Sequence, residues 1–225
     1  MAKVDGKTKR ATEDRFATAE FPQTRRGLYV CGINWGGADD DEMAEIVRRR
    51  RSFFSDDASG RYPYRDRILK WFELWDHPMA RTAEEAGDFE KSVSQTNWLR
   101  DRSRRSEHRT EPKYLLEHVE EFLEVVSARD PKVIFLFGSC LGSALERGLR
   151  QPLTRTRLAE VLGQPQGPVR SLTRDQRDEP KMKVRIFAFE NCRIICFPHP
   201  TGAKGLTNAQ IARYKPDVQE ALDFL

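Results

Sequence analysis

The chain has 225 residues, of which 33% are charged and 38% are hydrophobic, and its formal net charge is +4. This length provides for one sizeable hydrophobic core, and the sequence shows no sign of two similar halves. No apolar segment approaches the roughly 20 residues that span a bilayer, and the N-terminus lacks the apolar core of a signal peptide, so we expect a cytoplasmic protein with no membrane partner.

The first 26 residues are polar and weakly patterned, and we interpret residues 1–26 as a loose N-terminal leader before a single domain over residues 27–225. The domain opens with a short apolar segment, Leu28 to Cys31, which is typical of a buried strand. Residues 32–37 then form a loop rich in glycine. Acidic residues followed by arginines predict a helix over 40–50, because that order of charges matches the helix dipole.

The middle of the chain alternates between helical and strand patterns. Helical spacing of apolar residues predicts a helix over 64–75, residues 92–99 read as a strand, and Thr110 and Pro112 open the clearest helix, which continues to Val126. A buried strand over 133–137 and a helix over 139–149 follow. Residues 151–182 are rich in arginine, glutamine and proline and give no firm prediction.

The last part of the chain predicts two strands and a helix. A strand over 183–189 turns at residues 190–191 into the apolar run 194–197. Thr207 and Gln210 have the spacing of a capping box and start a C-terminal helix, which is interrupted near Pro216. Because strands alternate with helices, we expect an α/β fold with a central mostly parallel β-sheet flanked by helices.

The four cysteines, Cys31, Cys140, Cys192 and Cys196, lie in or beside apolar strands and form no paired C-x-x-C knuckles. This placement favours buried free thiols over disulfides or a zinc or iron–sulfur site, and we expect no cofactor.

The basic residues are unevenly distributed. Arginines are consecutive from 48 to 51, residues 100–109 are densely basic, and a third group consists of Arg147, Arg150, Arg155 and Arg157. Such runs are often only solvated faces, but several in one small protein favour a polyanionic partner such as nucleic acid.

The apolar run that ends at Phe197 is followed by His199 between Pro198 and Pro200. Prolines cannot donate to a sheet and fix φ, so this pattern predicts a rigidly held histidine at the carboxyl end of a strand, where ligands bind in open α/β sheets. A solvent-facing histidine in a capped turn is the alternative. Asn34 and Asn97 also follow predicted strands, so the three side chains could converge on one pocket at the edge of a parallel sheet.

These segments resemble motifs of the uracil-DNA glycosylase superfamily. The segment from Gly32 to Gly36 is similar to the Gly-Ile-Asn-Pro-Gly motif of its mismatch-specific branch, with Trp35 where proline is usual, and the segment from Pro198 to Thr201 is similar to the family's His-Pro-Ser/Thr motif. Asn97 falls where several branches of the family place an asparagine that reads the base. Residues 133–138 match the family's strand and glycine that come between that asparagine and the histidine motif. The resemblance is confined to these four short segments, and it implies the family's three-layer sandwich of helices around a sheet.

The resemblance also implies roles for the residues that match. Asn34 would orient the attacking water and His199 would stabilise the departing base, while Phe53 or Phe54 would stack on a base flipped out of the DNA. Asn97, with one acceptor and two donors, would read the base edge, although a strand-end cap is its alternative. For at least one of the two phenylalanines, core packing is the alternative role, and for Asn34 it is a turn residue.

The neighbouring positions complete the predicted site. The backbones of Ile33 and Trp35 would lie against the base. Contacts to DNA are expected from the two glycine loops and the basic segment, at Gly36, Gly37, Arg100, Arg102, Arg104, Arg105, Thr201, Gly202, Lys204 and Gly205.

The sequence therefore predicts a monomeric, monofunctional DNA glycosylase without a metal, which removes uracil or another deaminated, damaged or modified base from DNA. Repair and defence against modified phage DNA are both compatible roles. No lysine stands in a motif position as a Schiff-base nucleophile, so strand cleavage is not expected. A non-catalytic nucleic-acid-binding protein of the same fold and a nucleotide or nucleoside hydrolase remain the alternatives.

Overall fold

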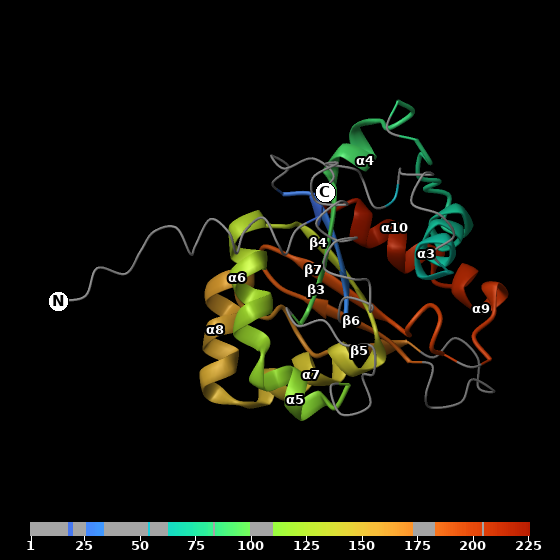
Figure 1. Cartoon of the computed structure of the whole chain (residues 1–225). Helices are drawn as coiled ribbons and strands as arrows, with labels where there is room; N and C mark the ends of the chain where they lie inside the picture. Colours follow the sequence, from blue (N-terminus) through green and yellow to red (C-terminus); the bar gives the residue numbers. More distant parts are fainter. Residues whose placement is uncertain are drawn as a thin grey trace, which may run out of the picture.

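The structure, a computed structural model, describes residues 18–19, 26–33, 54, 63–82, 84–99, 110–172, 183–203 and 205–225. These residues form a seven-stranded sheet with the strand order β1-β3-β2-β4-β7-β6-β5 (Figure 1). The four central strands are parallel to one another: β3 (Val93–Asn97), β2 (Leu28–Gly32), β4 (Val133–Phe137) and β7 (Arg193–Phe197). The chain passes from β2 outward to β3 and then back across β2 to β4, so the direction of winding reverses between β2 and β4.

The outer strands are antiparallel to their neighbours. β6 (Val184–Ala188) returns as a hairpin into β7, and β5 (Arg170–Leu172) pairs with β6. On the opposite edge, β1 (Thr18–Ala19) pairs with β3, so part of the segment predicted to be a loose leader adds a strand to the sheet. The sheet is therefore mixed, with a parallel centre and antiparallel edges.

Helices cover both faces of the sheet, as Figure 1 shows. One face carries α3 (Pro63–Leu74), α4 (Asp88–Ser92), α9 (Asn208–Ala212) and α10 (Lys215–Leu222). The other face carries α5 (Pro112–Glu117), α6 (Val119–Arg129), α7 (Ser139–Arg150) and α8 (Pro152–Leu162). This layered arrangement confirms the predicted α/β class.

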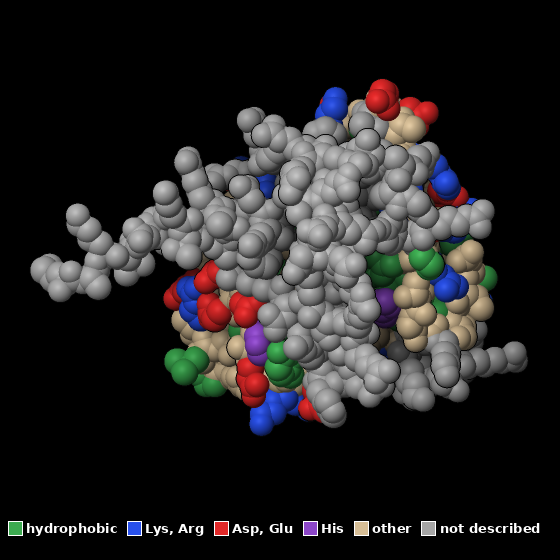
Figure 2. All heavy atoms as spheres, in the orientation of Figure 1, with side chains coloured by type: hydrophobic (Ala, Val, Ile, Leu, Met, Phe, Trp, Pro, Cys, Tyr) green, Lys and Arg blue, Asp and Glu red, His purple; other side chains and the backbone are tan. Residues whose placement is uncertain are grey.

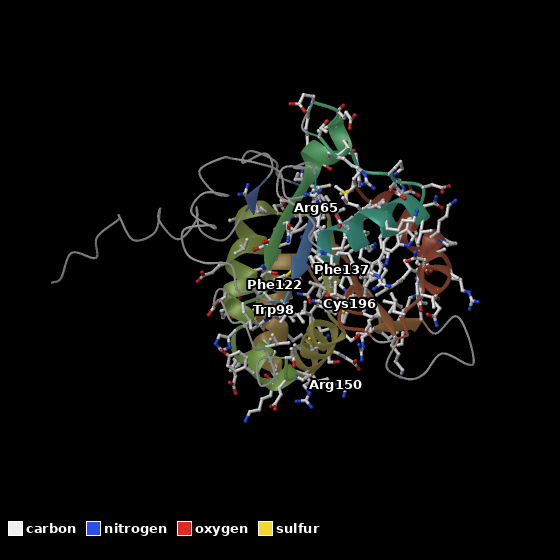
Figure 3. The ribbon with its side chains drawn as sticks, turned by 45° about the vertical axis from the view of Figure 1, so that its right-hand side comes forward. Arg65, Trp98, Phe122, Phe137, Arg150 and Cys196 are labelled. Carbon is white, nitrogen blue, oxygen red and sulfur yellow. The ribbon has the colours of Figure 1, made fainter. Side chains whose placement is uncertain are left out.

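Two hydrophobic clusters hold these layers together, because successive side chains of a strand point to opposite faces. On the α3 face, Trp75 stacks on Phe197 with ring centroids 4.9 Å apart, and its indole N–H donates to the Ile211 carbonyl at 3.0 Å. On the other face, Trp98 stacks on Phe122 at 4.2 Å (Figure 3). Strands β2, β4 and β7 are buried on both faces, which explains why their sequences are nearly continuous apolar runs, whereas β3 buries the polar residues Ser94, Gln95 and Thr96.

Two predicted helices are each broken into two. The helix expected from Thr110 to Val126 is interrupted at His118, whose backbone leaves the helical region (φ −105°, ψ 16°) while its ring Nδ1 lies 2.9 Å from the Tyr114 carbonyl oxygen. The C-terminal helix is interrupted between α9 and α10, as predicted, and Pro216 lies in the first turn of α10. The capping box of Thr207 and Gln210 at the start of α9 is confirmed.

Some elements of the structure had no prediction from the sequence, and one predicted helix lies outside the described residues. The unassigned segment 151–182 supplies α8 and β5, and α4, which was not predicted from the sequence, directly precedes β3. The helix expected over 40–50 lies outside the described residues. All four cysteines are free thiols, and no helix in the described part of the chain is long and apolar enough to cross a membrane.

Candidate functional site

The carboxyl ends of the central strands form one edge of the sheet. Asn97 is the last residue of β3 and pairs in register with Gly32, the last residue of β2. Pairing continues beyond the strands, since the Trp98 amide donates to the Gly32 carbonyl and the Gly138 amide donates to the Phe197 carbonyl, each at 2.9 Å. Asn97 and His199 therefore lie at the same edge, as predicted. Asn34 comes two residues after the end of β2 in sequence but lies outside the described residues.

The loop after β7 fixes which ring nitrogen of His199 carries a proton. The ring Nδ1 accepts from the backbone amide of Gly202 at 3.0 Å and from that of Thr201 at 3.3 Å, and the Thr201 hydroxyl lies 3.3 Å away. An amide N–H can only donate, so Nδ1 must present its lone pair. The neutral ring then carries its proton on Nε2, which leaves Nε2–H as a donor.

The same environment keeps His199 neutral. Burial lowers the pKa of His199 below its ordinary value of 6.5. A second proton would have to enter at Nδ1, where it would face the two amide N–H groups instead of a lone-pair acceptor. At neutral pH the ring is thus an uncharged hydrogen-bond donor in a fixed orientation.

The side chain of Asn97 can lie over the end of β2 because residue 32 is glycine and has no Cβ. A Cβ placed on Gly32 would overlap Asn97 Oδ1 and would come within 3.1 Å of the Tyr64 hydroxyl oxygen. The amide oxygen of Asn97 and the hydroxyl of Tyr64 therefore both lie over the same glycine. No side chain larger than hydrogen fits at position 32 without displacing one of them.

Tyr64 lies in the first turn of α3, and its ring is close to that of His199. The two ring centroids are 5.5 Å apart, and the ring of Tyr64 also meets Phe137 edge-on at 6.3 Å. Burial raises the pKa of the Tyr64 hydroxyl well above its ordinary range, so the phenol stays neutral. Sequence reasoning missed Tyr64 as a site residue, because its only local signal is its place on the buried face of a predicted helix.

Comparison with known proteins gives no assignment. No family model matches the sequence, and no curated protein matches it. The function therefore has to be argued from the site itself.

The remaining predicted site residues have different surroundings. Ile33 is 9% exposed and its side chain packs close to Gly138, at the point where the winding of the sheet reverses. Phe54 is completely buried in the cluster on the α3 face, which corresponds to the core-packing role named for one of the two phenylalanines. Thr201, Gly202 and Gly205 lie exposed in the loop after β7, and Gly205 has a φ of +80°, which favours glycine.

The other predicted positions lie outside the described residues. They are Trp35, Gly36, Gly37, Phe53, Arg100, Arg102, Arg104, Arg105 and Lys204. Their proposed roles stay predictions.

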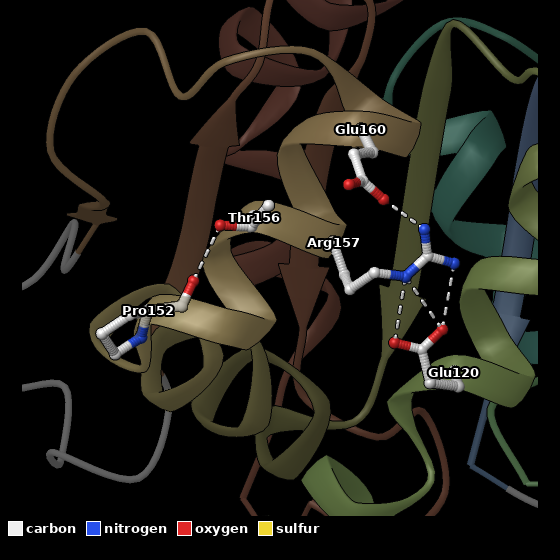
Figure 4. Close-up of polar contacts among 5 residues, drawn as sticks. All are labelled: Glu120, Pro152, Thr156, Arg157 and Glu160. Carbon is white, nitrogen blue, oxygen red and sulfur yellow. Dashed lines mark hydrogen bonds and ion pairs between the residues drawn. The ribbon is translucent and has the colours of Figure 1, made fainter.

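One of the basic groups is partly neutralised by ion pairs. Arg157 of α8 donates to both carboxylate oxygens of Glu120 in α6, at 3.2–3.3 Å, and also pairs with Glu160 (Figure 4). Arg150 pairs with Glu146 in the same helix. In Figure 2, acidic and basic side chains are interspersed over the described surface at the lower left, where α5 and α6 lie in Figure 1. A case for a polyanionic partner therefore rests on the other arginines.

The thiols do not provide a nucleophile. Burial raises the pKa of Cys140 to about 11 and that of Cys196 to about 12, so both stay protonated at neutral pH. Among the described residues, no three His, Cys, Asp or Glu side chains gather in a way that could hold a metal ion.

Proposed function

We propose that this protein is a monofunctional DNA glycosylase with a uracil-DNA glycosylase-like fold, acting in the cytoplasm as a monomer on DNA that contains an altered base. The observation that carries the proposal is the state of His199. Its ring is neutral, its Nδ1 accepts from loop amides, and its Nε2–H has no acceptor among the described residues and lies at the same sheet edge as the amide of Asn97.

This state suits the cleavage of an N-glycosidic bond. As the bond breaks, positive charge develops on the sugar and negative charge on the departing base. A preorganised Nε2–H donor aimed at a base oxygen stabilises that negative charge without paying to reorient during the reaction. Because the ring need not give up its proton completely, a neutral imidazole is sufficient.

The resemblance assigns the other roles in the reaction, which are base reading, water orientation and base stacking, to further residues. Asn97 would read the edge of the flipped base with its amide. Asn34 would hold a water near the sugar carbon, which as a cation needs little base strength in its attacker. Phe53 is then the phenylalanine left to stack on the base, since Phe54 is buried in the core.

The two alternative functions, nucleic-acid binding and nucleotide or nucleoside hydrolysis, place different demands on the carboxyl edge of the sheet. A nucleic-acid-binding protein has no need of a neutral histidine with a fixed tautomer. A nucleotide or nucleoside hydrolase would need the same chemistry but no extended basic surface. The first alternative predicts no abasic product, and the second predicts a product from free nucleosides as readily as from DNA.

A single-turnover assay tests the proposal. Purified protein in excess is incubated with oligonucleotide duplexes and single strands, each containing one altered base, and alkali converts abasic sites into strand breaks. We expect His199→Ala and Asn34→Ala each to lower the cleavage rate by at least about 10²-fold, the scale of losing one preorganised group, with little change in DNA binding. His118→Ala is the matched control, because His118 lies on the opposite helical layer against Tyr114.

The substrate panel should include uracil, deaminated purines, oxidised bases and phage DNA with natural modifications. We expect a range that extends beyond uracil, because Trp35 alters the loop that carries the proposed water-orienting Asn34. Excision of uracil alone would contradict that expectation. Absence of any abasic product across the panel, or near wild-type rates in both variants, would refute the proposed activity or its site.

A further inference from the structure

Asn97 ends β3 and His199 follows β7, and these two strands are not neighbours in the sheet. β3 and β7 are separated by β2 and β4 in the sheet, and three strand spacings amount to about 14 Å. A side chain that serves both residues would therefore lie between them, over the ends of β2 and β4.

Among the described side chains, that of Tyr64 lies close to both Asn97 and His199. Its ring lies 5.5 Å from the His199 ring, and its hydroxyl oxygen lies over Gly32, where Asn97 Oδ1 also lies. Its backbone is anchored in the first turn of α3, which begins with Pro63. Farther along the same helix, Trp71 and Phe72 pack against Phe137 and Phe135, so the helix that carries Tyr64 is fixed to the sheet.

Burial lowers the pKa of His199, and no charged group among the described residues contributes to the shift. The contacts of the ring include the neutral phenol of Tyr64 from α3 and the backbone amides of Thr201 and Gly202 from its own loop. The loop amides decide which nitrogen is protonated. The ring of Tyr64 lies 5.5 Å from that of His199, so it contributes to the burial that lowers the pKa of the imidazole.

We propose that Tyr64 is a positioning residue, whose ring holds His199 as an oriented neutral donor, while its hydroxyl oxygen lies with the Asn97 amide oxygen over the same glycine, Gly32. The catalytic role of this arrangement rests on the proposed glycosylase function. The packing of Tyr64 against His199 does not depend on that function. Without the aromatic ring, water reaches the imidazole and its protonated form becomes easier to reach. Without the hydroxyl alone, the ring still covers His199.

Nuclear magnetic resonance of the histidine ring nitrogens tests this proposal without requiring activity. The chain has four histidines, and the signals of His199 are assigned by their loss in His199→Gln. In the unmodified protein we expect the Nε2–H tautomer and a titration below pH 6.5. Tyr64→Ala should raise the pKa of His199 by at least about 0.5, whereas Tyr64→Phe should leave it unchanged, because the shift comes from burial by the ring.

Tyr114→Ala is the matched control. Tyr114 also lies against a histidine, with its ring centroid 4.3 Å from that of His118, but it belongs to the opposite layer. This variant should leave the titration of His199 unchanged. If Tyr64→Ala does not fold, Tyr64→Leu provides a side chain of similar apolar character without the aromatic face.

Single-turnover rates complete the test. Tyr64→Ala should slow base excision by about tenfold or more, with a larger loss at acidic pH, where more of His199 becomes protonated. An unchanged tautomer and titration of His199 in a folded Tyr64→Ala or Tyr64→Leu variant would overturn the proposal and leave Tyr64 a packing residue. If the nitrogen signals respond as expected but the unmodified protein excises no base, the proposed function fails and the positioning role stands.

Discussion

Replacing Gly32 by alanine is expected to damage the site far more than the fold. The new Cβ would overlap Asn97 Oδ1, and the oxygen would have to move by about 1 Å to restore ordinary van der Waals contact. A misplacement of about 1 Å in a group that positions a substrate can lower a rate by about 10²-fold. We therefore expect Gly32→Ala to slow single-turnover excision by up to about 10²-fold.

The effect on stability should be small by comparison. Overpacking costs roughly 1–3 kcal/mol when the neighbours cannot move, but the Asn97 amide is the end of a side chain and can rotate. Alanine in a strand also regains about 0.5–1 kcal/mol relative to glycine. Thermal unfolding should therefore show a modest shift in Tm. Gly148→Ala in α7, where a Cβ would come within 2.9 Å of Thr154, is the control for a crowded glycine elsewhere.

A double-mutant cycle provides the decisive measurement. In an Asn97→Ala background the overlapping oxygen is gone, so adding Gly32→Ala should have almost no further effect on the rate. If Gly32→Ala excises bases at the wild-type rate, the position of the Asn97 amide is irrelevant to the reaction. If the two substitutions act independently, the damage does not pass through Asn97, and the reasoning from the structure is wrong.

Two further predictions concern pH and salt. Because burial lowers the pKa of His199 below 6.5, folding holds the ring in its neutral form. The stability linked to this group is fully present above pH 6.5 and is lost as the pH falls toward the folded-state pKa. The difference in Tm between the wild type and His199→Gln should therefore change between pH 7.5 and pH 5. A constant difference in Tm would contradict the lowered pKa. Charge reversal in residues 100–109 should weaken DNA binding for all sequences and flatten its dependence on salt, because phosphate contacts release counterions. Unchanged filter-binding isotherms would mean that this segment contributes no phosphate contacts.

The strands and helices of the centre of the fold can be predicted from the sequence. Strands β2, β4 and β7 are buried on both faces and are therefore continuous apolar runs, which are recognisable without knowledge of their partners. Alternation with helices then implies parallel strands, and parallel strands place their carboxyl ends at one edge. The location of Asn97 and His199 at the same edge follows from this reasoning.

Other features depend on residues that are distant in sequence. The short edge strand β1 exists because it pairs with β3, some 75 residues later, and its two residues carry no pattern of their own. The arginines of α8 look like a basic patch in the sequence, but Arg157 is paired with Glu120 of another helix. Sequence reasoning counts such charges without knowing which of them are neutralised.

The sequence by itself determined the central strands, most of the helices beside them and the polar residues at the strand ends, because these depend on local periodicity and turn chemistry. Only the tertiary structure decided that Tyr64 lies between the two site residues and that Gly32 lies beneath the Asn97 amide. It also showed that the amides of Thr201 and Gly202 occupy Nδ1 of His199. These contacts arise when α3 packs across the ends of the strands and when the loop after β7 closes on its own histidine. Neither event leaves a periodic signal in the chain, since each depends on the direction of a side chain in the folded protein.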